Sequence, residues 1–230
     1  MFYTEYRGER DVNHGILTVR RPSIPAPEEI VEENEIPGRN GVLVVRNRKY
    51  RSITIPVEFN FLNKPDSWQD VYRIAKKWLK DSGKLRFSDD ADHFYKCYYP
   101  VITDVERTSR RLGNFTTEFR CDPFCYMDEG EKEIPLTTEL FNPGFETSPI
   151  YRITGEGNCT LTVNGYEFTA NVGQEIIIDT EKQIAYKNDG TFLNTDVTGD
   201  YERIWLAEGE NTLSASSGFT VSITPRWREL

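Results

Sequence analysis

The sequence predicts a mainly β protein of two domains, the first of them α+β with a single helix. Three observations indicate this class. Apolar and polar residues alternate along Tyr50–Phe61 with the two-residue period of a strand, and a strong helical period occurs only around Val71–Leu79. The second half of the chain consists of short apolar runs between turn residues. We therefore expect a β-sandwich or barrel with one helix, followed by a β-sandwich or jelly roll.

The domain boundary is expected in the stretch from Cys121 to Ile150, which is rich in proline and acidic residues and lacks a clear period. Charge changes across it. Residues 1–125 hold 21 basic and 19 acidic side chains, whereas residues 126–230 hold 7 and 18. The expected division is a first domain at 1–125, a linker at 126–141 and a second domain at 142–230.

Composition argues against several classes of protein. No apolar run is long enough to cross a membrane, the N-terminus has no hydrophobic signal core, and a net charge of −9 does not fit nucleic-acid recognition. We expect a soluble protein made in the cytosol, where Cys97, Cys121, Cys125 and Cys159 stay free thiols. Cys121 and Cys125 have no second pair at zinc-binding spacing, so no metal or other cofactor is expected.

The first domain begins with two short strands in Met1–Arg21, around a turn at Asn13–Gly15. The next segment, Pro22–Gly41, is rich in proline and glutamate and is expected to be a long loop that ends in a turn. Two interpretations of this loop are open: a solvated acidic loop, or an arm that reaches a neighbouring subunit. In the second interpretation the candidate contact residues are Glu28, Glu29, Glu32 and Glu33.

The clearest strand covers Tyr50–Phe61. Its polar face carries Pro56, which has no N–H to donate to a neighbouring strand. The strand is therefore expected at a sheet edge or at a bulge. Because an open edge can pair with another chain, Pro56 is a further candidate inter-subunit contact.

The helix is expected to start after Ser67 and to end before Ser82 and Gly83. Its apolar residues recur at helical spacing, and its opposite face is basic. That face is either solvated or a docking surface for the acidic loop or the acidic second domain of a neighbouring subunit. The candidate contact residues on it are Arg73, Lys76, Lys77 and Lys80.

Further short strands are expected in both domains, with Asn164-Gly165 and Asp189-Gly190 as hairpin turns. In the first domain these strands cover Lys84–Phe87, His93–Glu106 and Gly113–Cys121. In the second domain they cover Tyr151–Thr154, Cys159–Val163, Phe168–Asn171, Glu175–Asp179, Gln183–Lys187, Thr191–Leu193, Asn211–Ala215 and Phe219–Thr224.

Catalytic motifs are missing from the sequence. It contains no phosphate-binding loop, zinc-protease motif or nucleophile elbow, and its only histidines are His14 and His93. The acidic cluster beside His93 has the composition of a surface turn. Paired carboxylates need no local motif and stay open as an alternative. We therefore expect a protein that is not an enzyme.

Six segments are distinctive in combination. They are Pro37–Gly41, Ile53–Phe59, the helix end Trp78-Leu79, Gly113–Phe124, Asn142–Ile150 and Ile223–Arg228. In this order they resemble the distal tail protein (Dit) family of phages with long, non-contractile tails and of their prophages. The resemblance extends over essentially the whole chain.

The resemblance implies an N-terminal belt domain that assembles into a hexameric ring and a C-terminal galectin-like β-sandwich. Such a ring is a structural adaptor at the tail tip of the virion, made and assembled in the host cytoplasm. It joins the tail tube protein to the tail-tip protein and baseplate, and a receptor-binding protein is a further candidate partner.

Two other classes of protein stay open. One is a carbohydrate-binding module for host-surface glycans, and the other is a wall hydrolase that uses two carboxylates. Sugar binding needs Trp or Tyr beside clustered His, Asn and Arg, and the second half of the chain has no histidine and few cations. This leaves Trp205 and Trp227 as candidates, and a core or interface position is the simpler interpretation of both.

Overall fold

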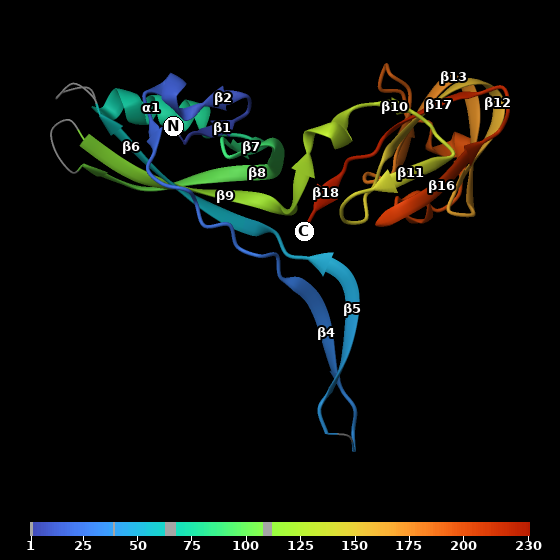
Figure 1. The fold of residues 1–230 in the computed structure, drawn as a ribbon, viewed down its shortest axis with the longest axis horizontal. Coiled ribbons are helices and arrows are strands. Elements are labelled where there is room, and N and C mark those ends of the chain that lie inside the picture. Colours follow the sequence, from blue (N-terminus) through green and yellow to red (C-terminus); the bar gives the residue numbers. More distant parts are fainter. Residues whose placement is uncertain (1, 39, 63–67, 108–111) are drawn as a thin grey trace. The chain divides into compact units, whose positions relative to one another are not determined.

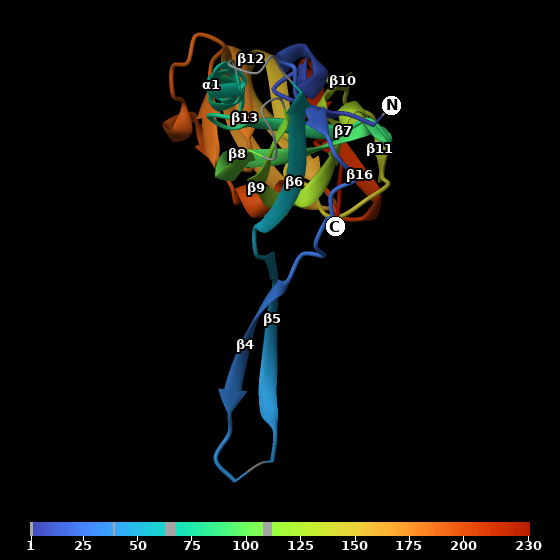
Figure 2. The ribbon, with the colours of Figure 1, turned by 90° about the vertical axis from the view of Figure 1, so that its left-hand side faces the viewer.

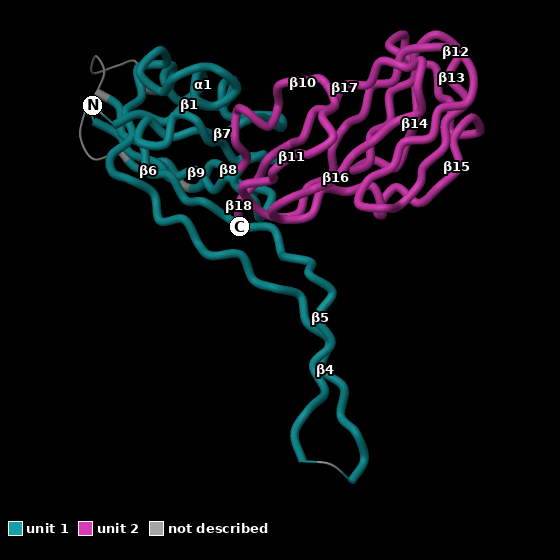
Figure 3. Tube along the Cα trace, turned by 45° about the vertical axis from the view of Figure 1, so that its right-hand side comes forward, with its two compact units in different colours: residues 1–125, 230 teal, residues 126–229 magenta. Residues whose placement is uncertain are grey.

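The structure is a computed structural model that describes residues 2–38, 40–62, 68–107 and 112–230. The chain divides into two compact units (Figure 3). Unit 1 comprises residues 1–125 together with Leu230, and unit 2 comprises residues 126–229.

Unit 1 is built on an open sheet with the strand order β2-β1-β7-β8-β9-β6-β3 (Figure 1). In the described part of the chain its end strands, β2 and β3, do not pair with each other. The barrel alternative is therefore wrong, because the sheet does not close. The elements are β1 (Thr4–Tyr6), β2 (Glu9–Arg10), η1 (Asp11–His14), β3 (Leu17–Thr18), β4 (Glu29–Glu35), β5 (Val42–Tyr50), β6 (Ile53–Leu62), α1 (Trp68–Trp78), β7 (Gly83–Phe87), β8 (Asp90–Arg107) and β9 (Leu112–Met127).

The core of unit 1 lies between this sheet and α1. The alternation predicted for β6 is confirmed, since Ile55, Val57, Phe59 and Phe61 are all buried on one face. α1 packs on that face through side chains that recur at helical spacing, and its residues Val71, Ala75 and Trp78 belong to the same buried cluster. The expected N-cap of the helix, Ser67, lies outside the described residues.

Unit 2 is a β-sandwich organised around one long hairpin, formed by β12 (Ile150–Val163) and β13 (Tyr166–Asp179). Its turn is the predicted Asn164-Gly165 pair, whose φ angles of 51° and 84° fit a type I′ turn. The sequence predicted two short strands in place of each long one. The physical reason is a bend: Gly155 has a φ of 153° and lies opposite Gln174, whose φ is 75°.

The two halves of this bent hairpin pair with different strands. The first half of β12 pairs with β17 (Thr220–Thr224), and its second half pairs with β16 (Gly209–Ala215). The hairpin thus passes from one layer of the sandwich to the other, and side chains from both layers form one buried cluster. The other elements are β10 (Ile134–Pro135), β11 (Glu139–Asn142), β14 (Ile184–Tyr186), β15 (Val197–Thr198), β18 (Arg228–Glu229) and the short helices η2 (Asp128–Glu131), η3 (Asn194–Asp196) and η4 (Tyr201–Ile204).

The linker expected at residues 126–141 is instead part of unit 2. β10 pairs with β17, β11 pairs with β16, and Gly130 is buried where the chain passes Trp227. The sequence did not indicate these strands for two reasons. Each is only two to four residues long, and each lies among prolines and acidic residues that favour a loop. The mainly β class, the one-helix first unit and the β-sandwich second unit are confirmed.

Candidate assembly surfaces

The segment predicted to be a long loop contains the first strand of a β-hairpin, and the second strand follows it. β4 and β5 pair from Glu29↔Tyr50 to Glu35↔Val42, with an irregularity after Ile30. They form a two-stranded sheet of their own, which stands apart from the larger sheet of unit 1 (Figure 2). The prolines before it and its glutamates favoured a loop, whereas the valine-rich run beginning at Val42 supplies the strand propensity.

Apolar side chains on this hairpin are exposed to solvent. Val42, Leu43, Val44 and Val45 are consecutive, so they point alternately to both faces of the hairpin. Ile30 and Val31 of β4 and Ile36, which follows β4, are exposed to a similar degree, and all seven side chains are 37% to 44% exposed. A hairpin of two strands is only marginally stable in water on its own. Burial of these side chains against another surface would stabilise it.

The four glutamates predicted to contact a neighbouring subunit all lie on or next to β4, and three of them contact β5 or the residue that follows it. The carboxylate of Glu29 lies 3.7 Å from Arg46, that of Glu28 lies 3.4 Å from Arg51, and Asn47 donates a hydrogen bond to Glu32. These contacts reduce the charge that Glu28 and Glu29 can offer to another subunit. The role of all four glutamates in assembly stays a prediction.

The basic face predicted for α1 is present. Arg73, Lys76 and Lys77 are exposed on the helix, and Lys80, which is also exposed, follows the end of the helix at Trp78. Three of them have contacts within unit 1: Arg73 lies 2.7 Å from Asp70, the Lys76 ammonium lies over the Tyr72 ring, and Lys80 lies 3.9 Å from Asp81. Exposed contacts of this kind are weak. The basic side chains can therefore leave them to form ion pairs with another protein.

The edge expected at Pro56 is present, but another segment of the chain lies beside it. On one side Pro56 pairs with Glu118 of β9; on the other side, pairing with β3 ends at Phe59. Pro56 therefore does lie at an edge of β6. However, it lines a hollow of about 290 Å³ together with Arg20, Arg21, Pro22, Ser23 and Glu58. The chain's own segment 20–23 thus lies beside this edge, which makes Pro56 a weaker candidate for pairing with another chain.

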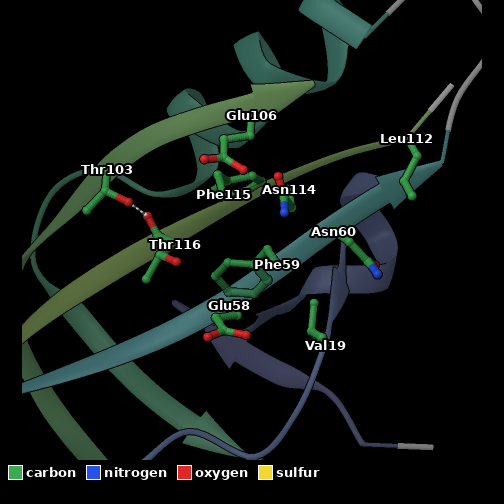
Figure 4. A pocket seen from close by; sticks show the side chains of 10 residues that line it. All are labelled: Val19, Glu58, Phe59, Asn60, Thr103, Glu106, Leu112, Asn114, Phe115 and Thr116. Carbon is green, nitrogen blue, oxygen red and sulfur yellow. Dashed lines mark hydrogen bonds between the residues drawn. The ribbon is translucent and has the colours of Figure 1, made fainter. Parts of the chain in front are cut away.

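A larger hollow of about 570 Å³ lies over the polar face of the same sheet (Figure 4). Sequence reasoning did not find it, because its side chains come from β6, β8, β9 and the residue after β3. Thr103 donates a hydrogen bond to the Thr116 carbonyl across it. The residues that line it are Val19, Glu58, Phe59, Asn60, Thr103, Glu106, Leu112, Asn114, Phe115 and Thr116.

The cysteine pair considered for metal binding is arranged differently. Cys121 and Cys125 are four residues apart on one strand, whereas the side-chain partner of Cys121 is Cys97 of β8. That hydrogen bond, followed by burial, raises the pKa of Cys121, and the same bond lowers the pKa of Cys97 despite burial. In the described residues no three His, Cys, Asp or Glu side chains gather as metal ligands, and no helix is long and apolar enough to span a membrane.

Comparison with known proteins bears on this arrangement. Residues 14–121, nearly all of unit 1, match the family model of the phage tail protein RIFT-related domain. Among solved structures, the chain is similar to SPP1 Dit (gp 19.1), described as a paradigm of the hub adsorption apparatus in phages that infect Gram-positive bacteria. The TM-score is 0.69, with 16% sequence identity over 100% of this chain and 98% of that one.

Residues 14–121 match a phage tail domain, and the whole chain has the Dit fold. The resemblance carried by the six sequence segments is confirmed at this level. At 16% identity the likeness to SPP1 Dit shows the fold, and the family model shows the tail domain. No curated protein sequence matches this chain.

Proposed function

We propose that this tail protein is a structural adaptor of the virion. Copies of it assemble into a hexameric ring at the distal end of a long, non-contractile tail, made and assembled in the host cytoplasm. The ring joins the tail tube protein to the tail-tip protein and baseplate, with a receptor-binding protein as a further candidate partner. The tail-domain match and the likeness to a hub adsorption protein support this role, which is structural and not enzymatic.

The hairpin β4–β5 is the observation that carries the proposal of assembly. Seven of its apolar side chains are more than one-third exposed, and it has no sheet partner among the described residues. Burying such side chains contributes roughly 25 cal/mol for each Å² removed from water. A ring repeats the same contact between neighbouring copies around its axis. In such a ring, each hairpin can therefore be covered by the neighbouring copy of the chain.

The test replaces apolar side chains without breaking the hairpin. In Val42→Lys/Val44→Lys each lysine lies opposite a glutamate, Glu35 or Glu33, so cross-strand pairing is kept. The control Asn34→Lys/Asn47→Lys adds the same charge to the same hairpin and removes no apolar side chain. Light scattering during size-exclusion chromatography should give six chain masses for wild type and control, and one for the valine variant.

Assembly on the phage tail gives a second readout. Tails carrying the valine variant should lack the distal hub in electron micrographs, whereas tails carrying the control should keep it. Hexamers of the valine variant, or normal hubs on its tails, would overturn the proposal. If wild-type protein is a monomer in isolation, the tail readout decides.

A further inference from the structure

A row of side chains crosses the outer face of one sheet of unit 2. Strand pairing places Arg152 of β12 opposite Ile177 of β13 on one side and opposite Ser222 of β17 on the other, while Ile177 lies opposite Tyr186 of β14. A hollow of about 160 Å³ opens over this row. It is lined by these four residues and by Glu133, Ile150, Asn188 and Thr224.

Two carboxylates hold the guanidinium of Arg152: Glu133, which lines the hollow, and Glu175, which lies outside its lining. Its Nη1 donates to Glu175, its Nε lies 3.1 Å from Glu133, and the Ser222 hydroxyl also donates to Glu133. All three charged side chains stay 29% to 44% exposed. A guanidinium has five N–H groups and each carboxylate several lone pairs. The network therefore presents fixed donors and acceptors side by side to a ligand.

The charges select the class of ligand. Glu133, Arg152 and Glu175 sum to one negative charge, which repels small anions, and the central guanidinium repels a metal cation. A neutral hydroxyl group suits the site, because it donates to a carboxylate and accepts from a guanidinium at the same time. Further groups in the hollow can both donate and accept hydrogen bonds. These are the hydroxyls of Ser222 and Thr224 and the amide of Asn188.

Apolar surface beside this network fits the carbon face of a sugar ring. Tyr186, Ile150 and Ile177 line the hollow with the polar groups; Tyr186 and Ile150 are half-buried, whereas Ile177 is only 3% exposed. Small-molecule sites combine apolar walls with a few fixed polar groups in this way. The volume is about half of the ~300 Å³ at which sites for drug-sized ligands begin, so the hollow has room for a single ring.

We infer that this hollow binds one neutral monosaccharide unit of a glycan. The combination that sugar recognition requires, an aromatic ring beside Asn and Arg, is supplied by Tyr186, Asn188 and Arg152. The tryptophans considered from the sequence do not contribute: Trp227 belongs to the core of unit 2, and Trp205 does not line the hollow. The inference is independent of the oligomeric state.

Saturation-transfer difference NMR on the full chain tests the site, because it detects weak ligands whether the protein is a monomer or a ring. The probes are glucose, galactose and N-acetylglucosamine, with N-acetyl-lysine amide as a cationic comparison. At least one sugar should receive saturation at its ring protons. Asn188→Ala and Tyr186→Ala should each reduce that signal at least several-fold.

The matched control is Asn171→Ala, an exposed asparagine on the same strand as Glu175 but outside the hollow. It should leave the sugar signal unchanged, and circular dichroism should show all three variants folded. The inference is overturned if no sugar receives saturation, if only the lysine probe does, or if Asn188→Ala and Tyr186→Ala bind as wild type does. The sugar-binding result does not depend on whether the protein forms hexamers, so the two proposals can fail independently.

Discussion

The guanidinium of Arg226 and the carboxylate of Asp179 form a bidentate pair inside unit 2, with N–O distances of 2.8 and 3.0 Å. The Asp179 side chain is 1% exposed. Arg226 also donates from Nη1 to the Ser148 carbonyl and from its backbone N–H to the Gly130 carbonyl. One residue therefore connects the end of β13, the segment before β12 and the segment before β10.

Removing this arginine should destabilise unit 2 strongly. Arg226→Ala leaves the Asp179 carboxylate buried without its main partner, which costs about 3–5 kcal/mol in comparable buried pairs. Amide hydrogen exchange of β12 and β13, measured by mass spectrometry, reports unit 2 separately. The control is Arg203→Ala, whose contact with Asp200 is exposed and should cost less than about 1 kcal/mol. Equal exchange in the two variants would contradict the prediction.

The same pair predicts a dependence of stability on pH. Burial alone would raise the pKa of Asp179, but the hydrogen bonds and charge of Arg226 outweigh it and hold the pKa below its ordinary value of 3.8. A carboxyl group with a lowered pKa stabilises the fold above that ordinary value, and the stabilisation is lost as pH falls through the folded-state pKa. Unit 2 should lose protection from exchange below about pH 4. A flat profile there would count against this role of the pair.

A methyl group at Gly130 should be poorly tolerated. A Cβ there would lie 2.1 Å from the backbone nitrogen of Trp227, so one of the two segments must move. Overpacking of this kind costs about 1–3 kcal/mol. Gly173→Ala is the matched control, because its Cβ would meet no atom within 4 Å and its φ is ordinary. Urea denaturation should show a lower midpoint for Gly130→Ala only.

Charge reversal on α1 tests the predicted contact of its basic face. Lys76→Glu/Lys77→Glu/Lys80→Glu should weaken the oligomer and reduce its sensitivity to salt, because an attraction between opposite charges becomes a repulsion. The corresponding glutamine variant removes the charge without reversing it and should fall between wild type and the glutamate variant. Sedimentation at several salt concentrations measures both effects. An oligomer unchanged in all three proteins would rule out this contact.

Local sequence patterns correctly predicted those secondary-structure elements that are determined by neighbouring residues. The alternation along β6 indicated which side chains are buried, the helical spacing indicated α1, and Asn164-Gly165 indicated the hairpin turn. In each case the physical cause lies within a few neighbouring residues. The predicted basic face of α1 has the same origin, since side chains three and four positions apart share one face of a helix.

The hairpin β4–β5 and the hollow of unit 2 depend on distant residues, so the sequence did not reveal them. β4 carries a run of glutamates without alternation, and its strand forms only because β5 pairs with it. In the hollow, Glu133 and Ser222 hydrogen-bond across 89 positions of the chain. No spacing rule covers such a pair. Strand register alone brings Arg152, Ile177 and Tyr186 into one row.

The exposure of the hairpin β4–β5 has a consequence for the lifetime of copies that find no partner. A two-stranded segment in water opens readily, and opened segments are where proteases cut. If the proposed ring forms, copies covered within it are protected, whereas copies without a partner offer a cleavage site. Turnover would then remove surplus chains and keep their number matched to the number of growing tails.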